Sequence, residues 1–332
     1  MKLIAFYSCL VLHLSILAQN QKINGIGFVS SQDSINETHV KPLINVNANY
    51  IAVNPFGFVR GLNVPKVNYN SNYQWFGETS EGIKQYAYQF KKNGVKIMLK
   101  PQIWVMQGSY TGHIKMKTEK DWVKFEASYQ AFILHFAKIA TDIDADIFCI
   151  GVELEQFTIQ RLAFWRKLIV EIKKVYKGKL TYAANWDEYK RVLFWNQLDF
   201  IGIDAYFPLS NLKTPSVNEL EKGWKTHKAL IKKAHLYYKK PILFTEFGYR
   251  SIDFAAKEPW DSSVSKLKQT NLIIQKNALQ AIYNQFWNEK WFAGGFLWKW
   301  FPEHHKSGGV KNNRFTPQNK PAELIIKKMY AN

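Results

Sequence analysis

The amino-acid sequence predicts an α/β protein folded as a single (β/α)8 TIM barrel. Three observations support this fold class: eight strand-like segments, helical segments between them, and no linker that divides the 332 residues. Hydrophobic residues make up 47% of the chain and charged residues 21%, so one large core can form. A doubly wound sheet is the alternative, but the glycine-rich phosphate loop typical of many such folds is not found here.

Eight short apolar runs are the predicted strands. They are separated by longer segments, which is the order that a parallel barrel requires. In chain order the runs are INGIGFV near residue 23, NYIAVNPF at 49, VKIMLKPQIW at 95, DIFCIGVEL at 146, KLTYAANW at 179, DFIGIDAYF at 199, PILFTEF at 241 and AGGFLWKW at 293.

Three of the intervening segments show clear helical periodicity, with apolar residues recurring every three or four positions. They span residues 119–141, 162–175 and 267–289. The apolar face of the first carries Trp122, Phe125, Tyr129, Phe132, Ile133, Phe136 and Ile139.

The loops that follow the strands are the long ones. Links from helix to strand are short, so the long loops should gather at the C-terminal face of the barrel, where sites of this fold are built. Trp75, Trp104, Tyr110 and Trp260 lie in these loops, which predicts an aromatic mouth. The long links span residues 57–80, 103–118, 249–265 and 301–318.

The first 18 residues are predicted to be a signal peptide. Lys2 precedes an apolar run from Leu3 to Leu17, which is short for a bilayer span of ~20 residues. Cleavage after Ala18 would leave a barrel domain of residues 19–332, secreted or periplasmic and not inserted in a membrane. An uncleaved anchor is the alternative.

The remaining composition argues against several classes of partner. Cys149 is the only cysteine after residue 18, so no intramolecular disulfide is expected, and its strand setting indicates a buried thiol. The net charge is +19, yet there is no basic tail or nucleic-acid motif, so we expect solvated surface charge and no nucleic-acid partner. His304, His305 and Glu303 could suggest a metal site, but no further candidate ligands lie at a suitable spacing in the sequence. We expect no metal, no cofactor and a monomer.

Two predicted strands end in a carboxylate, at Glu153 and Glu246. Side chains alternate along a strand, so Cys149, Gly151 and Glu153 should face the barrel interior, with Phe148, Ile150 and Val152 toward the helices. By the same rule Phe244 and Glu246 should share a direction. Glu155, just past its strand, is the competing candidate for the first carboxylate.

Other polar or aromatic side chains should point into the same mouth. Gly202, Asp204 and Tyr206 lie on one face of the sixth strand, opposite two isoleucines. A hydrophobic core would not use such residues, so we expect a binding site. The further candidates for it, from the second, third and fifth strands, are Asn54, Lys100, Gln102, Trp104 and Asn185.

A pair of carboxylates across a barrel mouth is the arrangement that glycoside hydrolysis requires. Retaining enzymes hold two carboxyl groups about 5–5.5 Å apart, one as nucleophile and one as acid and base. The alternative is that Glu153 and Glu246 are strand-end acids paired with surface Lys or Arg residues.

Several segments resemble the clan A glycoside hydrolases, and within them family 113, the β-1,4-mannanase family. The resemblance runs from about residue 23 to 330 and implies that Glu153 is the acid/base and Glu246 the nucleophile. It also implies that Tyr206 lies near the nucleophile and that Trp298 or Trp300 forms an apolar floor under the sugar. The segments are IMLKPQIW, DIFCIGVELEQF, DFIGIDAYFPLS, ILFTEFGYRS and GGFLWKWFP.

Two positions depart from the pattern that the resemblance implies. Val152 stands where many clan A enzymes have an Asn that binds the sugar 2-hydroxyl, and Gln102 stands where relatives often have another polar residue. Both departures concern which sugar is bound and not the glycosidase chemistry.

The expected function is therefore a secreted, retaining endo-glycosidase acting on β-1,4-linked hexose polymers, with mannan or glucomannan as the substrate. Its partner would be a polysaccharide or oligosaccharide. The alternatives are another clan A β-glycanase, a transglycosylase, or a carbohydrate-binding barrel without catalysis.

Overall fold

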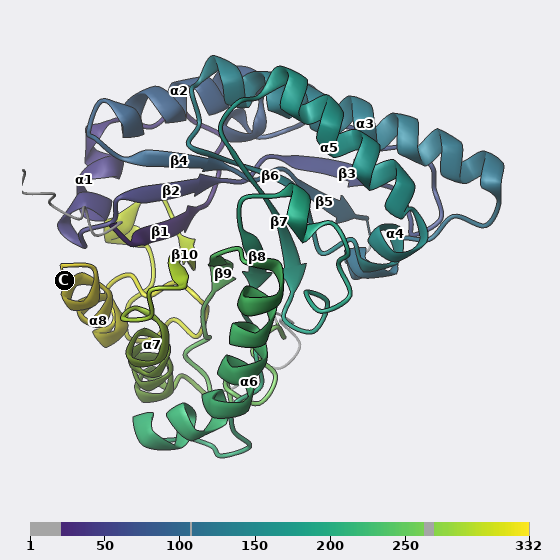
Figure 1. The fold of residues 1–332 in the computed structure, drawn as a ribbon. Coiled ribbons are helices and arrows are strands. Elements are labelled where there is room, and N and C mark those ends of the chain that lie inside the picture. Colours follow the sequence, from purple (N-terminus) through teal and green to yellow (C-terminus); the bar gives the residue numbers. More distant parts are fainter. Residues whose placement is uncertain (1–20, 107, 262–268, 332) are drawn as a thin grey trace, which may run out of the picture.

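A computed structural model describes residues 21–106, 108–261 and 269–331 of the chain (Figure 1). Eight parallel strands close into a barrel in the order β1-β10-β9-β8-β7-β6-β4-β2, which confirms the predicted fold class. All eight predicted strands are present in it. The barrel strands are β1 (Ile23–Phe28), β2 (Tyr50–Val53), β4 (Lys96–Leu99), β6 (Ile147–Val152), β7 (Lys179–Asn185), β8 (Ile201–Asp204), β9 (Ile242–Phe247) and β10 (Phe292–Trp300).

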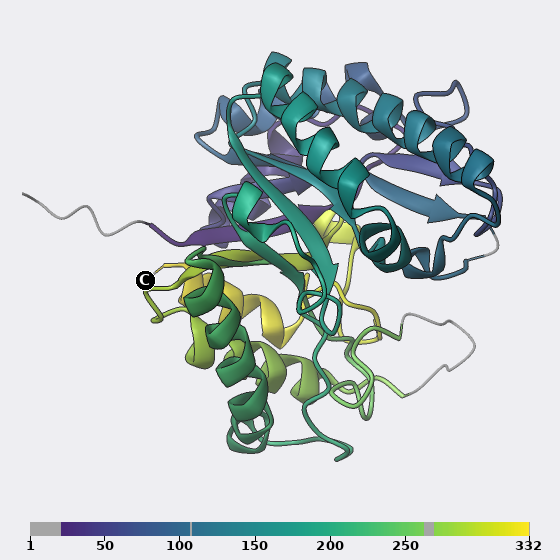
Figure 2. The same ribbon diagram turned by 45° about the vertical axis from the view of Figure 1, so that its right-hand side comes forward.

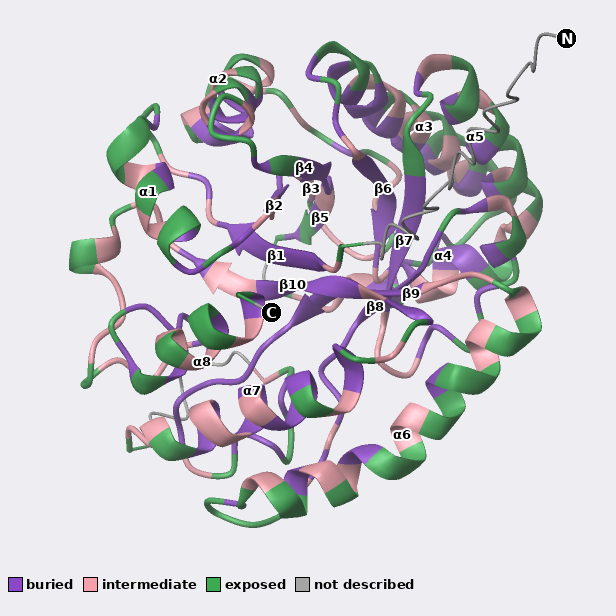
Figure 3. Cartoon of the chain, turned by 60° about the vertical axis from the view of Figure 1, so that its left-hand side comes forward, coloured by how far each residue is buried: buried purple, intermediate pink, exposed green. Residues whose placement is uncertain are grey.

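Helices surround the barrel and bury their apolar faces against it, as the burial colours of Figure 3 show. The predicted segment 119–141 forms α3, and all seven residues of its apolar face are buried. Thr118 caps α3 by accepting a hydrogen bond from the Asp121 N–H at 3.1 Å. The α-helices are α1 (Glu37–Asn45), α2 (Ser80–Lys91), α3 (Glu119–Asp142), α4 (Glu155–Gln160), α5 (Leu162–Val175), α6 (Val217–Tyr238), α7 (Leu272–Phe286) and α8 (Pro321–Tyr330).

A two-stranded ribbon extends the barrel on one side. β3 (Phe56–Val59) and β5 (Gln102–Val105) pair in parallel and project beyond β2 and β4, under α3 (Figure 2). Pro55 and Pro101 separate the ribbon from the barrel strands, because proline has no N–H to donate to a ladder. The sequence pattern predicts loops or the ends of barrel strands for these residues, and not a separate ribbon. The ribbon carries Gln102 and Trp104 to the mouth of the barrel.

The barrel interior is filled by small and apolar side chains. Cys149 is fully buried there, as its strand setting predicted, and burial raises the pKa of its thiol to about 12. The residues of this interior cluster are Ile23, Ala52, Met98, Ile147, Cys149, Val152, Ala183, Phe200, Leu243 and Phe296.

The predicted alternation along β6 fails at its C-terminal end. A Cβ at Gly151 would lie 2.7 Å from the Tyr129 hydroxyl oxygen, so this position faces the helices, whereas Val152 belongs to the interior cluster. The register against β7 shifts between Cys149 and Val152. A bulge of this kind adds a residue and reverses the direction of those that follow.

A second irregularity lies in β9. Phe244 packs on Trp224 of α6 and Phe286 of α7, and therefore points away from the interior that Glu246 faces. Along β8, Ile203 pairs with Phe244 and Asp204 with Glu246, so β9 has one extra residue. The expectation that Phe244 and Glu246 share a direction was wrong, because a bulge turns Glu246 inward.

The predicted signal peptide, residues 1–18, lies outside the described residues. No helix in the described part of the chain is long and apolar enough to cross a membrane.

Candidate active site

A cleft of about 820 Å³ opens at the C-terminal ends of the barrel strands. Both predicted carboxylates, Glu153 from β6 and Glu246 from β9, line it. Aromatic rings form much of the remaining wall. The other lining residues are Phe56, Gln102, Ile103, Trp104, Val105, Gly108, Ser109, Tyr110, Thr111, Val152, Asn185, Trp186, Asp187, Asp204, Tyr206, Trp260, Asp261, Trp298 and Phe315.

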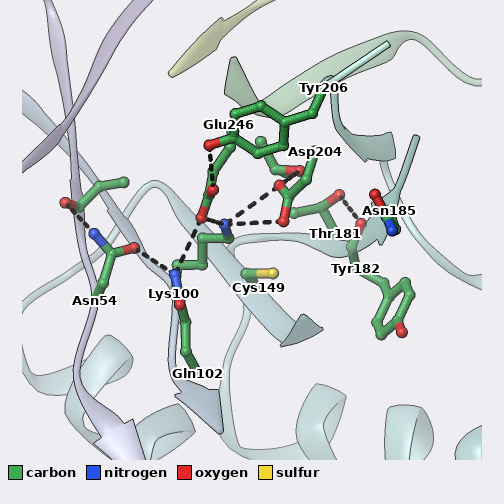
Figure 4. A network of polar contacts seen from close by, with 12 residues as sticks. Asn54, Lys100, Gln102, Cys149, Thr181, Tyr182, Asn185, Asp204, Tyr206 and Glu246 are labelled. Carbon is green, nitrogen blue, oxygen red and sulfur yellow. Dashed lines mark hydrogen bonds and ion pairs between the residues drawn. The ribbon is translucent and has the colours of Figure 1, made fainter. Parts of the chain in front are cut away.

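The Glu246 carboxylate is held by three donors, which Figure 4 shows around it. The Tyr206 hydroxyl donates to Oε2 at 2.8 Å, and Gln102 Nε2 donates to Oε1 at 3.2 Å. Lys100 Nζ forms an ion pair with the same Oε1. The three donors come from different strands: Gln102 from β5, Lys100 from just after β4 and Tyr206 from just after β8. Because both carboxylate oxygens are held, the group has one orientation toward the cleft.

Lys100 is a fully buried cation between two carboxylates. Its Nζ lies 3.3 Å from Asp204 Oδ1 as well as contacting Glu246. Burial lowers the pKa of Lys100, but the charges of Asp204 and Glu246 outweigh it and hold that pKa above the ordinary value. A buried charge is tolerated when it is paired, so Lys100 keeps its proton and ties the two acids together.

Asp204 completes this buried group. Its Oδ1 accepts a hydrogen bond from the Thr245 hydroxyl at 2.7 Å, and the side chain is 1% exposed. Burial and the negative charge of Glu246 raise the pKa of Asp204 to about 7, against the opposing effect of Lys100. Alternation along β8 had placed Asp204 inward, but its contact with Lys100 could not be read from the sequence.

Glu153 stands in a different setting, at the end of the β6 bulge. Its backbone has φ 49°, in the left-handed region that non-glycine residues rarely adopt. Three hydrogen bonds hold this backbone. The Glu153 N–H donates to Ala183 O at 2.8 Å, the Thr111 hydroxyl donates to Glu153 O at 3.1 Å, and the Leu154 N–H donates to Tyr182 Oη at 2.6 Å.

The side chain of Glu153 has no hydrogen-bond donor among the described residues. Burial raises the pKa of Glu153 well above its ordinary value, and the negative charges of Asp204 and Glu246 raise it further. This environment favours the neutral, protonated form of the carboxyl group. The two acids of the cleft differ in environment: one is surrounded by donors and a cation, and the other is not.

Glu188 is a buried carboxyl that the sequence analysis missed. It accepts hydrogen bonds from the Tyr182 hydroxyl at 2.6 Å and from the Asn185 N–H at 3.0 Å. Burial raises its pKa to about 8. Through Tyr182 it supports the Leu154 N–H, beside Glu153. The only signal in the sequence was the acidic pair that follows Trp186.

The competing candidate Glu155 belongs to a surface ion pair. Its Oε1 lies 2.5 Å from Arg191 Nε, and it does not line the cleft. An ion pair with a surface Lys or Arg is the alternative role that the sequence allows for Glu153 and Glu246.

The other predicted site residues divide into those that line the cleft and those that do not. Trp104 is 52% exposed in its wall, and Asn185 donates to the Tyr110 hydroxyl at 2.9 Å. Asn54 is 5% exposed and lies behind Gln102, whose Nε2 is 3.5 Å from Asn54 Oδ1.

The tryptophans of β10 separate in the same way. Trp298 is partly exposed and lines the cleft, whereas Trp300 is fully buried and packs against His304. Trp300 therefore cannot form a sugar floor, contrary to its place among the predicted site residues. The pairing register of β10 with β1 skips Lys299, so the two tryptophans do not share a face.

A stacked pair of tryptophans closes another side of the cleft. The rings of Trp186 and Trp260 lie 5.3 Å apart at 14°. Trp186 follows β7 and Trp260 follows β9, and these two strands flank β8 in the barrel. β8 lies opposite β2, on the side of the barrel where the ribbon carries Trp104. Aromatic side chains therefore stand on two opposite sides of the carboxylates.

Metal ligands do not cluster in the described ranges: no group of three or more His, Cys, Asp or Glu side chains there could hold an ion. His304 Nε2 contacts Glu323 Oε1 of α8 at 2.8 Å. The Nε2 atom of the neighbouring His305 lies 3.8 Å from Glu303 Oε2.

The family model for Glycoside Hydrolase Family 113 matches residues 29–320. The chain belongs to glycoside hydrolase family 113. This confirms the resemblance that the strand-end motifs indicated. No curated protein matches the chain.

Solved structures similar to this family 113 member share its fold. A GH113 β-mannanase from Alicyclobacillus acidocaldarius superposes with a TM-score of 0.80 at 22% identity, covering 94% of this chain and 97% of that one. A GH113 β-1,4-mannanase gives 0.79 at 23% identity, covering 94% and 99%. A β-glucuronidase from Ruminococcus gnavus gives 0.61 at 14% identity, with 93% of this chain and 49% of the other covered.

Proposed function

We propose that this glycoside hydrolase is a retaining endo-β-1,4-mannanase, with mannan or glucomannan as substrate. The observation that carries the proposal is the contrast between the two acids of one cleft: Glu246 is held by Lys100, Gln102 and Tyr206, whereas Glu153 has no donor among the described residues and burial raises its pKa. Retaining hydrolysis needs these two states at the start of the reaction. The solved GH113 β-mannanases support the choice of sugar.

In the first step, a Glu246 oxygen attacks the anomeric carbon as the bond to the leaving sugar breaks. Glu153 gives its proton to the leaving oxygen, which departs as a hydroxyl group. Lys100 and Tyr206 keep the attacking carboxylate in position. The product of this step is a glycosyl ester on Glu246 and an ionised Glu153.

In the second step, Glu153 acts as a base. It takes a proton from a water molecule, and the resulting hydroxide attacks the anomeric carbon and releases Glu246. Two inversions give net retention. The pKa of Glu153 should fall during the first step, because the charge of Glu246 is lost when the ester forms.

Internal cleavage is supported by the aromatic side chains on opposite sides of the acids. A polymer lying between Trp104 and the stacked Trp186 and Trp260 would cross the cleft with sugars on both sides of the cleaved bond. Sugar rings pack their C–H faces on such side chains. An enzyme that cleaves only chain ends needs one side closed.

Export through a signal peptide is part of the same proposal. The apolar run from Leu3 to Leu17, with Ala18 after it, supports it. A secreted or periplasmic enzyme would meet its polymer outside the cytoplasm. N-terminal sequencing of the exported protein should begin at Gln19.

The deciding experiment is to incubate the enzyme with mannan, glucomannan, xylan and β-glucan. Reducing ends and the anomeric configuration of the first products are followed by NMR. We expect rapid release from mannan or glucomannan, a mixture of internal fragments, and products that are initially the β-anomer. α-Anomers would overturn the retaining mechanism, and release from xylan or β-glucan alone would overturn the choice of sugar.

A further inference from the structure

Two cations beside the cleft have no acidic partner. Lys299, in β10, and Arg314, in the loop before α8, are both partly buried. Neither side chain forms an ion pair or donates a hydrogen bond to any described residue. The masked stretches 1–20, 107, 262–268 and 332 contain no Asp or Glu, so no acidic side chain remains to pair with them. Charged side chains are seldom buried without a partner, so two partly buried cations that lack one are informative.

Both residues adjoin the wall of the cleft. Lys299 follows Trp298, and its Nζ lies 5.3 Å from the centroid of that ring. Arg314 precedes Phe315, which lines the cleft and packs at 6.0 Å against Tyr206, a partner of Glu246. Lys299 lies near enough to Glu246 and to Arg314 for both charges to act on it, which places the two cations on the Glu246 side of the cleft.

The electrostatics of this region are positive. Burial lowers the pKa of Lys299, the charge of Arg314 lowers it further, and only Glu246 opposes them. Burial and Arg314 likewise lower the pKa of Arg250, which Asp261 partly offsets. Like charges held together cost free energy, which a bound anion would recover.

A buried amine, that of Lys320, also contacts the backbone of Arg314. Lys320 Nζ donates to Ser251 Oγ at 2.9 Å, to Asn312 Oδ1 at 3.1 Å and to Arg314 O at 2.9 Å, all uncharged acceptors. Burial lowers its pKa to about 7. Lys320 thus fixes the backbone that carries Arg314, and it has no acidic partner among the described residues.

We propose that Lys299 and Arg314 bind an anionic group on the substrate, a carboxylate or a sulfate ester on a sugar in the cleft. The inference rests on the proposed function and narrows its substrate class to acidic β-glycans. A guanidinium suits this task because its planar donors match two oxygens of a carboxylate or sulfate. The net charge of +19 would also attract an anionic polymer over longer distances. Solubility of the protein does not need so large an excess of one sign.

The test compares polymers with one backbone. Glucomannan, glucomannan oxidised at C6 to the uronate, and sulfated glucomannan are given to the enzyme and to Arg314→Gln and Lys299→Gln variants. Lys311→Gln, an exposed cation three residues before Arg314, is the matched control. The measured quantity is the ratio of kcat/KM on the charged polymer to that on the neutral one.

We expect the ratio to exceed ten for at least one charged polymer and to fall at least tenfold in both variants. The control should keep the ratio of the unmodified enzyme. The polymer that is preferred identifies the anion. A ratio near one in the unmodified enzyme overturns the inference, and so does an equal loss on neutral and charged polymers, which would give the two cations a structural role.

Failure of the inference and failure of the proposed function can be told apart. Cleavage of neutral glucomannan without preference for a charged form leaves the function standing. If no polymer is cleaved, NMR titration with D-glucuronate and with D-glucose still reports on the site. Binding of glucuronate alone, lost in Arg314→Gln, would support the anion site while the hydrolase proposal fails.

Discussion

The two carboxylates of the cleft are built into the barrel in opposite ways. Glu246 sits in a dense group of side chains, where Lys100 and Tyr206 contact its oxygens and Asp204 lies behind. Glu153 is positioned through its backbone, by hydrogen bonds to its own peptide groups, and its carboxyl group has no donor among the described residues. The same residue type therefore meets one environment that fixes an anion and another that favours the neutral acid.

The largest effect should come from removing the acid in the dense group. Replacing Glu246 with Ala should lower kcat by about 10⁴-fold or more, ~5.5 kcal/mol of transition-state stabilisation, because no nucleophile remains. Added azide should restore turnover and give a glycosyl azide of inverted configuration, detected by NMR. A retained azide product would reverse the roles of the two acids.

Replacing Glu153 with Gln should separate substrates by their leaving groups. On polysaccharide, kcat should fall about 10²–10⁴-fold because no proton reaches the leaving oxygen. Aryl glycosides with good leaving groups should still form the ester, and with Glu153→Ala azide should then give a retained product. Equal losses on both kinds of substrate would contradict an acid role.

The pH profile offers a further check on Glu153. Because its pKa is raised, the reactive, protonated form persists to higher pH than in an ordinary carboxyl group and is lost as the pH rises through the raised value. We expect kcat/KM to decline on the alkaline side, and Glu153→Gln to remove that decline for aryl glycosides. Because the folded state binds this proton more tightly than the unfolded chain, stability should also fall over the same rise in pH.

The buried cation of the dense group should matter for stability. Lys100→Met leaves Asp204 and Glu246 together without a counter-charge, and we expect a loss of about 3–5 kcal/mol in the free energy of unfolding, measured with urea. Lys84→Met breaks an exposed pair with Asp142 and should cost less than ~1 kcal/mol. Similar losses in the two variants would show that Lys100 is not the charge that holds the group together.

The smallest effect concerns the backbone support of Glu153. Tyr182→Phe removes the acceptor of the Leu154 N–H and one partner of Glu188, and we expect kcat to fall about tenfold, ~1.4 kcal/mol, with little change in KM. The alkaline limb of the pH profile should also move. Tyr176→Phe, which loses a buried hydrogen bond to Ala145 O, should leave that limb in place. A shift in both variants would indicate a general loss of packing.

The sequence allowed the barrel and its two acids to be predicted for identifiable reasons. Each barrel strand is a short apolar run, and the long loops after the strands placed the cleft at one end. Glu153 and Glu246 were found because a carboxylate at the end of a buried strand needs a function or a partner. Strict alternation along each strand, however, predicted the wrong side-chain directions for the residues beside both acids, because it does not allow for a bulge.

The sequence by itself thus determined the order of elements, the single interior cysteine and the residue types at the strand ends, because these follow from local apolar patterns. Only the tertiary structure decided which of them meet. Lys100, Asp204 and Glu246 come from three strands, Trp300 turns away from Trp298, and Glu188 reaches Tyr182 behind the cleft. Closure of the barrel and the β6 and β9 bulges set these contacts, and both depend on pairing between strands distant in the chain.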